Sequence, residues 1–208
     1  MIRIHHLNNS RSQRVLWLLE ELALPYEIMS YERDSQTNLA PDALKRIHPL
    51  GKSPVLEDGD HIVIESGAII EYVVRRYGAG RLAPEEGSPD WVRYLQWMHY
   101  AEGSAMLPLI LKLYLSRLGD AAAPLQPRVN DEIENHIGYL DAALAHQDYF
   151  VGKELTAADI QLSFVIQAAR MLHGLGSFPN LGRFLDRIHA RPAYRRALER
   201  GGPYAFGS

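Results

Sequence analysis

Short apolar segments with two different periodicities alternate through the first part of the chain, and this alternation limits the possible folds more than any other feature of the sequence. Residues 2–7 and 26–31 have the length and composition of strands. Between them, residues 12–22 place apolar side chains at i, i+3, i+4 and i+7, which predicts an amphipathic helix. Residues 41–47 predict a short helix with proline in its first turn. These segments predict the first half of a small α/β domain.

A hairpin and a third helix complete this pattern. The strand-like residues 55–56 and 62–64 flank the turn sequence EDGD, as in a β-hairpin. Ser66 then precedes an apolar stripe that continues to Tyr77, so we expect a helix with Ser66 as its N-cap. The order βαβαββα within residues 1–80 predicts an α/β domain of the thioredoxin-like type.

The rest of the chain is helical in pattern. The stretch YGAGRLAPEEGSPD is rich in glycine and proline, which favours a linker, and we place this linker at residues 81–87. No strand-like alternation follows, so residues 88–208 are expected to form an all-α helical domain. Its helices are expected at residues 91–118, 127–145, 157–172, 178–190 and 192–200.

The chain of 208 residues contains no cysteine. Disulfide bonds, thiolate metal sites and a cysteine nucleophile are therefore excluded. Any thiol chemistry must use a thiol that belongs to the ligand.

Charge, histidine spacing and hydropathy argue against several kinds of partner. The 22 basic and 25 acidic residues form no basic run, so no nucleic-acid partner is expected. His5 and His6 are adjacent on a predicted strand and face opposite ways, and no H-x-H or H-x-x-x-H pair occurs, so no metal site is expected. No apolar run approaches the ~20 residues that span a bilayer, and no signal-peptide pattern is present, which predicts a cytoplasmic protein without membrane association.

The stretch GKSPVLEDGDHIVIES, residues 51–66, indicates a binding site. Pro54 stands directly before a strand, where it forms either a strand-start turn or a cis peptide that exposes the backbone of Ser53 to a ligand. Glu65 and Ser66 begin a helix, whose free N–H groups and dipole favour an anionic group. The alternative for Ser66 is the N-cap role alone.

Several stretches together resemble the glutathione S-transferase superfamily: NNSRSQRVLWLLEEL, HPLGKSPVLED, IVIESGAIIEYV and FVGKELTAADIQLSFV. The resemblance extends over nearly the whole chain. It implies that Pro54 is cis and that Ser53 offers its backbone to the cysteinyl part of glutathione. It also implies that Glu65 and Ser66 hold the γ-glutamyl ammonium and carboxylate, that Lys52 binds the glycyl carboxylate, and that the protein is a homodimer.

The polar patch LNNSRSQR, residues 7–14, lies between the first strand and the first helix, where a group that stabilises the glutathione thiolate must lie. It contains no tyrosine or cysteine, which argues against the tyrosine-dependent and mixed-disulfide branches of the family and favours a serine/asparagine-type site. Lowering a thiol pKa of about 8.5 by two units requires roughly 2.7 kcal/mol. One hydrogen bond to the charged sulfur and a helix N-terminus together supply about that much. Ser10 is the first choice of donor, with Arg11 raising the local positive potential; Asn9 is the reserve, and Ser12 is expected to be the helix N-cap.

Two later stretches concern the helical domain. In LTAAD, Thr156 and Asp159 form a capping-box pattern, which indicates a structural role. The resemblance implies that Tyr100, Met106 and Tyr114 line an adaptable pocket for an apolar electrophile.

The expected function is therefore conjugation of glutathione, a co-substrate, to an electrophilic and largely apolar small molecule, with no further cofactor. A glutathione-dependent peroxidase or disulfide reductase is one alternative. A non-catalytic, glutathione-transferase-like binding module is the other.

Overall fold

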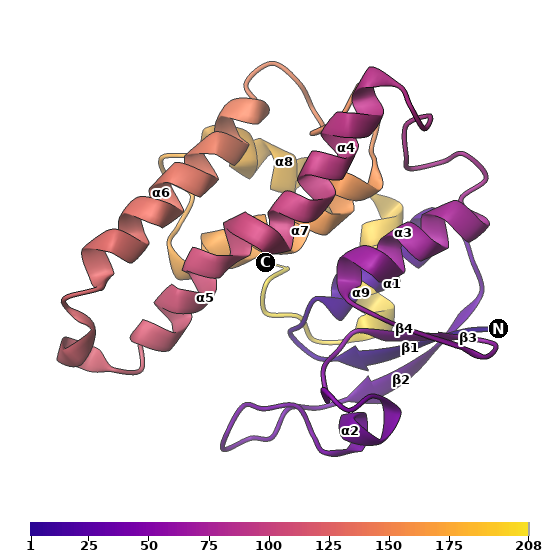
Figure 1. Cartoon of the computed structure of the whole chain (residues 1–208), viewed down its shortest axis with the longest axis horizontal. Helices are drawn as coiled ribbons and strands as arrows, with labels where there is room; N and C mark the ends of the chain where they lie inside the picture. Colours follow the sequence, from indigo (N-terminus) through magenta and orange to yellow (C-terminus); the bar gives the residue numbers. More distant parts are fainter. Residues whose placement is uncertain (208) are drawn as a thin grey trace. The chain divides into compact units, whose positions relative to one another are not determined.

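The computed structural model describes residues 1–207, which form two compact units of different architecture (Figure 1). The first unit contains Met1–Leu82 together with the C-terminal segment from His189, and the second contains Ala83–Ile188. Our sequence-based division assigned that C-terminal segment to the helical domain. Its packing within the first unit, described below, explains the difference.

The first unit is built on a four-stranded mixed sheet. Its strands are β1 (Ile2–Leu7), β2 (Tyr26–Tyr31), β3 (Val55–Asp58) and β4 (His61–Ile64), and its first three helices are α1 (Ser12–Glu21), α2 (Ala43–Ile47) and α3 (Ser66–Tyr77). The strand order is β2-β1-β3-β4, with β1 parallel to β2 and the other pairs antiparallel. The predicted order βαβαββα and the thioredoxin-like fold are thereby confirmed.

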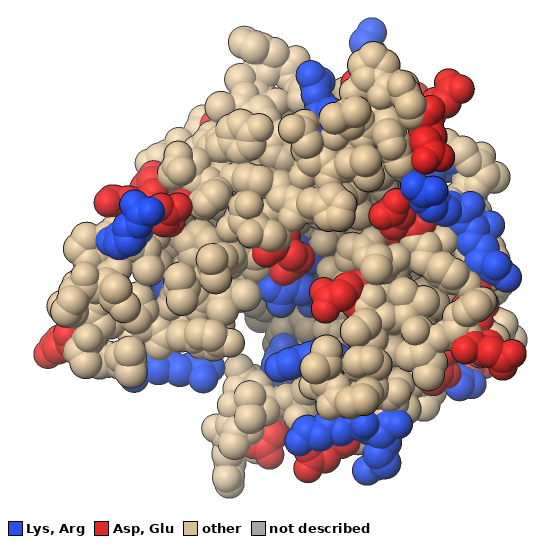
Figure 2. All heavy atoms as spheres, in the orientation of Figure 1, with Lys and Arg blue, Asp and Glu red and all other residues tan. Residues whose placement is uncertain are grey.

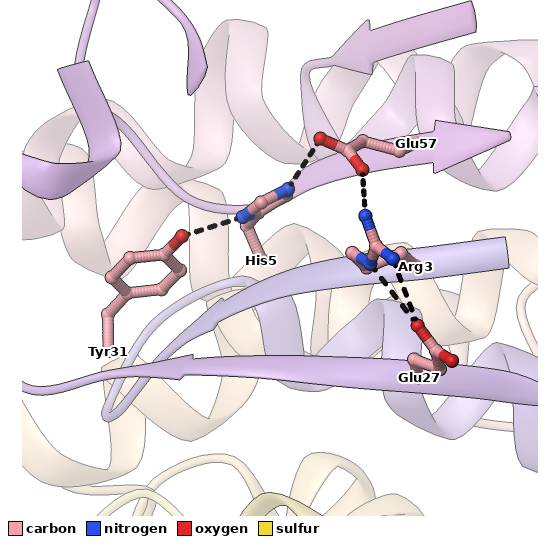
Figure 3. A network of polar contacts seen from close by, with 5 residues as sticks. All are labelled: Arg3, His5, Glu27, Tyr31 and Glu57. Carbon is pink, nitrogen blue, oxygen red and sulfur yellow. Dashed lines mark hydrogen bonds and ion pairs between the residues drawn. The ribbon is translucent and has the colours of Figure 1, made fainter. Parts of the chain in front are cut away.

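Alternation along β1 separates the two faces of the sheet. On one face, Arg3 bonds to Glu27 at 3.2 Å and to Glu57 at 2.9 Å, while His5 lies between the Tyr31 hydroxyl at 2.8 Å and Glu57 at 3.1 Å (Figure 3). His6 has other partners, in α1 and at the end of α9. The two histidines therefore face opposite ways, as predicted.

Helix α9 (Pro192–Gly201) packs on α1 and so joins the C-terminal segment to the first unit. Tyr194 meets the buried Trp17 edge to face, with ring centroids 5.3 Å apart. Glu20, which is 8% exposed, accepts hydrogen bonds from Arg196 at 2.8 Å and from Arg200 at 2.9 Å. The two residues of each pair are more than 170 positions apart in the sequence, so helical periodicity could not reveal the contact.

The second unit consists of helices: α4 (Pro89–Tyr100), a π-helical segment (Ala101–Ala105), α5 (Met106–Leu115), a 3₁₀ turn (Gly119–Ala122), α6 (Gln126–Ala143), α7 (Ala157–Leu172) and α8 (Pro179–His189). The predicted helix 91–118 is thus interrupted, and it ends earlier. Pro108 lacks an N–H and its ring clashes with the carbonyl four residues before it, at Ser104, which accounts for the widened turn there. Among residues 1–207, no helix is long and apolar enough to cross a membrane.

The predicted capping box at the start of α7 is confirmed. The carboxylate of Asp159 accepts hydrogen bonds from the main chain of Thr156 at 2.7 Å, from the Thr156 hydroxyl at 2.9 Å and from the main chain of Phe150 at 2.8 Å. Burial raises the pKa of Asp159 to about 6, although these hydrogen bonds oppose the shift. Asp159 is fully enclosed, so its role is to hold α7 and the loop before it together.

Candidate functional site

The Ser53–Pro54 peptide bond is cis, as the resemblance implied. The Ser53 hydroxyl accepts a hydrogen bond from the Leu7 N–H at 3.1 Å and donates one to the His5 carbonyl at 2.8 Å, so its side chain is tied to the end of β1. Within the described residues, neither the N–H nor the C=O of Ser53 pairs with another main-chain group. The main chain of Ser53 is therefore available to pair with an extended peptide ligand.

Helix α3 begins at Ser66, directly after Glu65, whose φ is +66°. The prediction that Ser66 is the N-cap is wrong, because Ser66 is the first helical residue and no side chain caps this helix. Ser66 is 4% exposed, and its hydroxyl instead accepts a hydrogen bond from Arg14 of α1 at 3.0 Å. Glu65 is exposed. A buried guanidinium thus adds positive charge to a helix N-terminus that already favours anions.

These contacts bring three predicted binding segments together at the C-terminal end of β1: the turn between β1 and α1, the loop that carries Ser53, and the start of α3. Ser53 is tied to His5 and Leu7 of that strand, and the start of α3 is tied to α1 through Arg14. Sequence analysis missed Arg14, which is 1% exposed. The signal was its position four residues before Leu18, on the apolar side of the predicted helix.

The turn between β1 and α1 differs from the prediction at Ser12. Helix α1 begins at Ser12 and no side chain caps it, so Ser12 is not its N-cap. The Ser12 hydroxyl is fully buried, 2.8 Å from Nδ1 of His6 and 3.2 Å from the Leu7 carbonyl. The Ser12 main-chain N–H donates to the Ser10 hydroxyl at 3.2 Å.

The direction of the hydrogen bonds in this turn follows from its chemistry. The Gly201 carbonyl, 3.1 Å from Nε2 of His6, can only accept, so Nε2 carries a proton. Burial lowers the pKa of His6, which leaves Nδ1 of the neutral ring as an acceptor for the Ser12 hydroxyl. The Ser10 hydroxyl then donates to the Ser12 oxygen at 2.8 Å. Ser10 is 6% exposed, and its single proton is already used.

Unlike the Ser10 hydroxyl, the side-chain amide of Asn9 has N–H groups that are not used in hydrogen bonds among the described residues. Its φ is +50°, in the left-handed region that asparagine tolerates. Its Oδ1 accepts the main-chain N–H of Ala205 at 2.7 Å, and because that donor requires an acceptor, the orientation of the amide is fixed. The Asn9 amide group makes no other hydrogen bond within residues 1–207, so its two N–H protons remain available. The role of Ala205 in orienting Asn9 has no local signal in the sequence.

Lys52 is exposed on the loop before Ser53, as a residue that binds a carboxylate must be. The neighbouring α2 carries Lys45 and Arg46 in its last turn. On the face in Figure 2, acidic and basic side chains are interspersed, without a continuous basic surface. No group of three or more His, Cys, Asp or Glu side chains in the described part of the chain could hold a metal ion.

Within the helical unit, a cavity of about 550 Å³ lies along α4, the π-helical segment and α6. It is lined by Arg93, Gln96, Trp97, His99, Tyr100, Gly103, Ser104 and Tyr139. Tyr100 is among the lining residues, and burial raises its pKa to about 12. Met106 is only 5% exposed and Tyr114 is 58% exposed; neither contributes to this cavity, so the three predicted residues do not converge there.

Two protein families match the sequence. The N-terminal domain of glutathione S-transferase matches residues 2–75, and the C-terminal domain of glutathione S-transferase matches residues 101–192.

Individual proteins give the same result. Glutathione S-transferase 3 of Schizosaccharomyces pombe is 37% identical over 96% of this chain and 88% of its own length, and glutathione S-transferase 1 of Saccharomyces cerevisiae is 32% identical over 96% and 95%. A crystal structure of a glutathione S-transferase from Actinobacillus pleuropneumoniae superposes with a TM-score of 0.92 at 34% identity, covering 99% of this chain and 95% of that one. A Methylobacterium radiotolerans glutathione S-transferase in complex with glutathione sulfonate superposes with a TM-score of 0.78 at 26% identity, covering 98% and 95%. The chain belongs to the glutathione S-transferase family.

Proposed function

We propose that this glutathione transferase joins the sulfur of glutathione to an electrophilic, largely apolar small molecule, with no metal or organic cofactor. We place the reaction in the cytoplasm, where thiols are kept reduced. The observation that carries the proposal is the free amide of Asn9. It lies at the start of α1, beside the β1 end that Ser53 and its neighbours surround.

Glutathione binding uses the three converging segments. The main chain of Ser53 pairs with the cysteinyl residue, and the cis bond to Pro54 gives the backbone its required direction. The γ-glutamyl carboxylate binds at the N-terminus of α3, near Ser66, and its ammonium group binds the exposed Glu65. Lys52 binds the glycyl carboxylate. The hydrogen bond from Arg14 to Ser66 supports this assignment, because it brings positive charge to the carboxylate end.

Thiolate stabilisation is assigned to Asn9, with Arg11 adding positive potential. Ser10, our first choice from the sequence, could donate to sulfur only by giving up its hydrogen bond to Ser12. Ser12 is fully buried and donates to His6. The amide N–H of Asn9 can donate a hydrogen bond to the sulfur without breaking another hydrogen bond. One hydrogen bond to a charged acceptor contributes about 1.5–3 kcal/mol, equivalent to a thiol pKa lowered by one to two units.

The electrophile is assigned to the helical unit. The half-buried Tyr100 supports this, because its ring lines the cavity and can contact an apolar ring. Met106 and Tyr114 remain in the proposal as residues of α5 that could contact a larger substrate, although they lie outside the Tyr100 cavity.

A homodimer is the proposed assembly. Several large apolar side chains of α4 and α5 are exposed, which supports an interface there. They are Val92, Leu107, Leu111, Leu113 and Tyr114. Size-exclusion chromatography with light scattering tests it, and a monomer at micromolar concentration would contradict it.

The function is tested by titrating the thiol of bound glutathione, through its ultraviolet thiolate absorbance, and by turnover with a chloronitrobenzene acceptor. We expect a bound thiol pKa about two units below the ordinary value of about 8.5. Asn9→Ala should raise that pKa by about one to two units, which lowers the thiolate fraction and the turnover at pH 7 by about three- to twenty-five-fold. Ser10→Ala is the matched control, and it should shift the thiol pKa by less than about 0.3 unit and turnover by less than about twofold.

Two outcomes would contradict this account. Failure of the wild-type protein to bind glutathione at millimolar concentration would exclude the transferase function. A raised thiol pKa in Ser10→Ala together with an unchanged one in Asn9→Ala would return the donor role to Ser10. A parallel assay with an organic hydroperoxide and with a mixed disulfide measures the two alternative reactions of the same thiolate.

A further inference from the structure

Arg33, just after β2, contacts the turn that carries Asn9. Its Nε donates to the Asn8 carbonyl at 3.2 Å and its Nη2 donates to the Asn9 carbonyl at 3.1 Å. Its Nη1 donates to the carbonyl of Asn38 at 3.1 Å. We propose that Arg33 is a positioning residue of the thiol site, which holds the Asn8–Asn9 turn in shape and supplies positive charge that favours the thiolate. This inference rests on the proposed function of Asn9.

Two hydrogen bonds from main-chain N–H groups also hold the Asn8–Asn9 turn. The Asn8 N–H donates to the Tyr31 carbonyl at 3.2 Å, and the Arg33 N–H donates to Oδ1 of Asn8 at 3.1 Å. Tyr31 is itself fixed by its hydroxyl, which lies 2.8 Å from His5 in the network of Figure 3. The end of β2 is thus a rigid base from which the Arg33 side chain reaches both carbonyls of the turn. Without that side chain, no group in the described residues donates to the Asn9 carbonyl, and the turn loses one of the contacts that hold Asn9 at its positive φ.

The second role of Arg33 is electrostatic. Arg33 is half-buried, and its guanidinium bonds only to carbonyl oxygens; it forms no ion pair within residues 1–207. The carboxylate of the neighbouring Asp34 is turned away and accepts hydrogen bonds from Thr37 and Gln36 instead. Burial lowers the pKa of Arg33, and the nearby charge of Arg11 lowers it further.

The charge of Arg11 lowers the pKa of Arg33, so the two guanidinium groups are close enough to interact, and an anion near Arg33 is favoured by its positive charge. The thiolate next to Asn9 is such an anion. A positive charge within about 4–6 Å lowers the pKa of an acidic group by about one to three units, which is large enough to measure. Sequence analysis did not single out Arg33, because a lone arginine after a strand has the pattern of an ordinary surface residue.

The test compares Arg33→Met, Arg33→Lys and wild type, with Arg75→Met as the matched control. Arg75 is an exposed arginine of α3 that pairs with Glu71 and lies outside the thiol site. The measurements are the pKa of the bound glutathione thiol, the glutathione dissociation constant, and kcat as a function of pH. Arg33→Lys retains the charge but lacks the planar guanidinium that bonds to the carbonyls of Asn8, Asn9 and Asn38, so it separates the two roles.

For Arg33→Met we expect a thiol pKa raised by about one unit and a kcat about threefold lower at pH 7, because the thiolate fraction falls by that factor. The loss should disappear at high pH, where the thiol ionises without help. Glutathione affinity should change less than twofold at pH 6, where most of the bound thiol is protonated in both proteins. Arg33→Lys should show a smaller shift in thiol pKa, and Arg75→Met none.

An unchanged thiol pKa in Arg33→Met, or an equal loss of kcat at every pH, would overturn the inference while leaving the proposed function intact. If wild-type protein itself does not lower the pKa of the bound thiol, the proposed function fails, and the inference fails with it.

Discussion

The contact between α1 and α9 depends on Glu20, and removing its carboxylate should loosen the C-terminal segment. Glu20 accepts hydrogen bonds from the hydroxyl of Tyr26 at 2.9 Å and from Arg196 and Arg200. The guanidinium of Arg200 also lies over the Tyr26 ring, 3.8 Å from its centroid. Glu20→Ala would leave the hydroxyl of Tyr26, a residue 7% exposed, without its acceptor.

The magnitude follows from how exposed the partners are. The buried bond from Tyr26 to a charged acceptor contributes about 1.5–3 kcal/mol. The side chains of Arg196 and Arg200 are 52% and 42% exposed, so solvent screening limits each ion pair to about 0–1 kcal/mol. Tyr26 and Glu20 both lie outside α9, so loss of their bond lowers the unfolding free energy of the first unit, whereas loss of the two ion pairs destabilises the docked state of α9 by about 1 kcal/mol. Glu20→Gln keeps an acceptor for Tyr26 and should cost about 1 kcal/mol.

The assay is amide hydrogen exchange of α9 followed by mass spectrometry. A loss of about 1 kcal/mol corresponds to α9 exchange about fivefold faster in Glu20→Ala. Burial raises the pKa of Glu20, but the hydrogen bonds from Arg196, Arg200 and Tyr26 outweigh it and the net shift is downward. The stabilisation is therefore fully present above about pH 4.3 and is lost at lower pH.

The matched control is Glu27→Ala, since Glu27 is an exposed glutamate that pairs with Arg3 in the same unit, and it should leave α9 exchange unchanged. Equal α9 exchange rates in wild type and Glu20→Ala would refute the reasoning. Equal effects of the Gln and Ala variants on the unfolding free energy in urea would also refute it, because the Tyr26 bond distinguishes them there.

Three further changes have defined outcomes. Removing the residues after Gly202 deletes the Ala205 N–H that holds the Asn9 amide, so the bound thiol pKa should rise while the glutathione dissociation constant stays within threefold. Asp159→Ala leaves three buried donors unsatisfied and should lower the melting temperature by about 10 °C, measured by calorimetry. Burial lowers the pKa of His6, so its contribution to stability is complete above about pH 6.5 and is lost as pH falls; urea unfolding of His6→Gln should depend less on pH in that range than wild type.

The order of elements and the fold class were predictable because they depend on local periodicity. Residues 2–7 and 26–31 are strands with the predicted bounds, and α7 covers the predicted residues. The interruption before α5 was not predicted. Within the π-helical segment, Ala101 and Ala105 keep the i, i+4 spacing of a buried helix face, and only Pro108 marks the missing hydrogen bond.

The site was predictable in outline, and the cis bond at Pro54 was anticipated from the family resemblance. The choice among Asn9, Ser10 and Ser12 was not predictable. It depends on which protons are already used, and that depends on Gly201 and on Ala205, nearly 200 positions away. A sequence pattern records which groups can donate a hydrogen bond, but tertiary structure decides which of them are still free to do so.

A site in which an amide donates the hydrogen bond to the thiolate responds to pH differently from one that uses a serine hydroxyl. The Ser10 hydroxyl is hydrogen-bonded to Ser12, and Ser12 is hydrogen-bonded to His6. If Ser10 were the donor to sulfur, its ability to donate would therefore change when His6 is protonated. The amide of Asn9 does not titrate, and neither does Arg33 within the physiological range. If Asn9 and Arg33 act as proposed, every fixed group around the sulfur keeps one charge state between pH 5 and 9. The acidic limb of the kcat profile should then contain a single ionisation, that of glutathione itself.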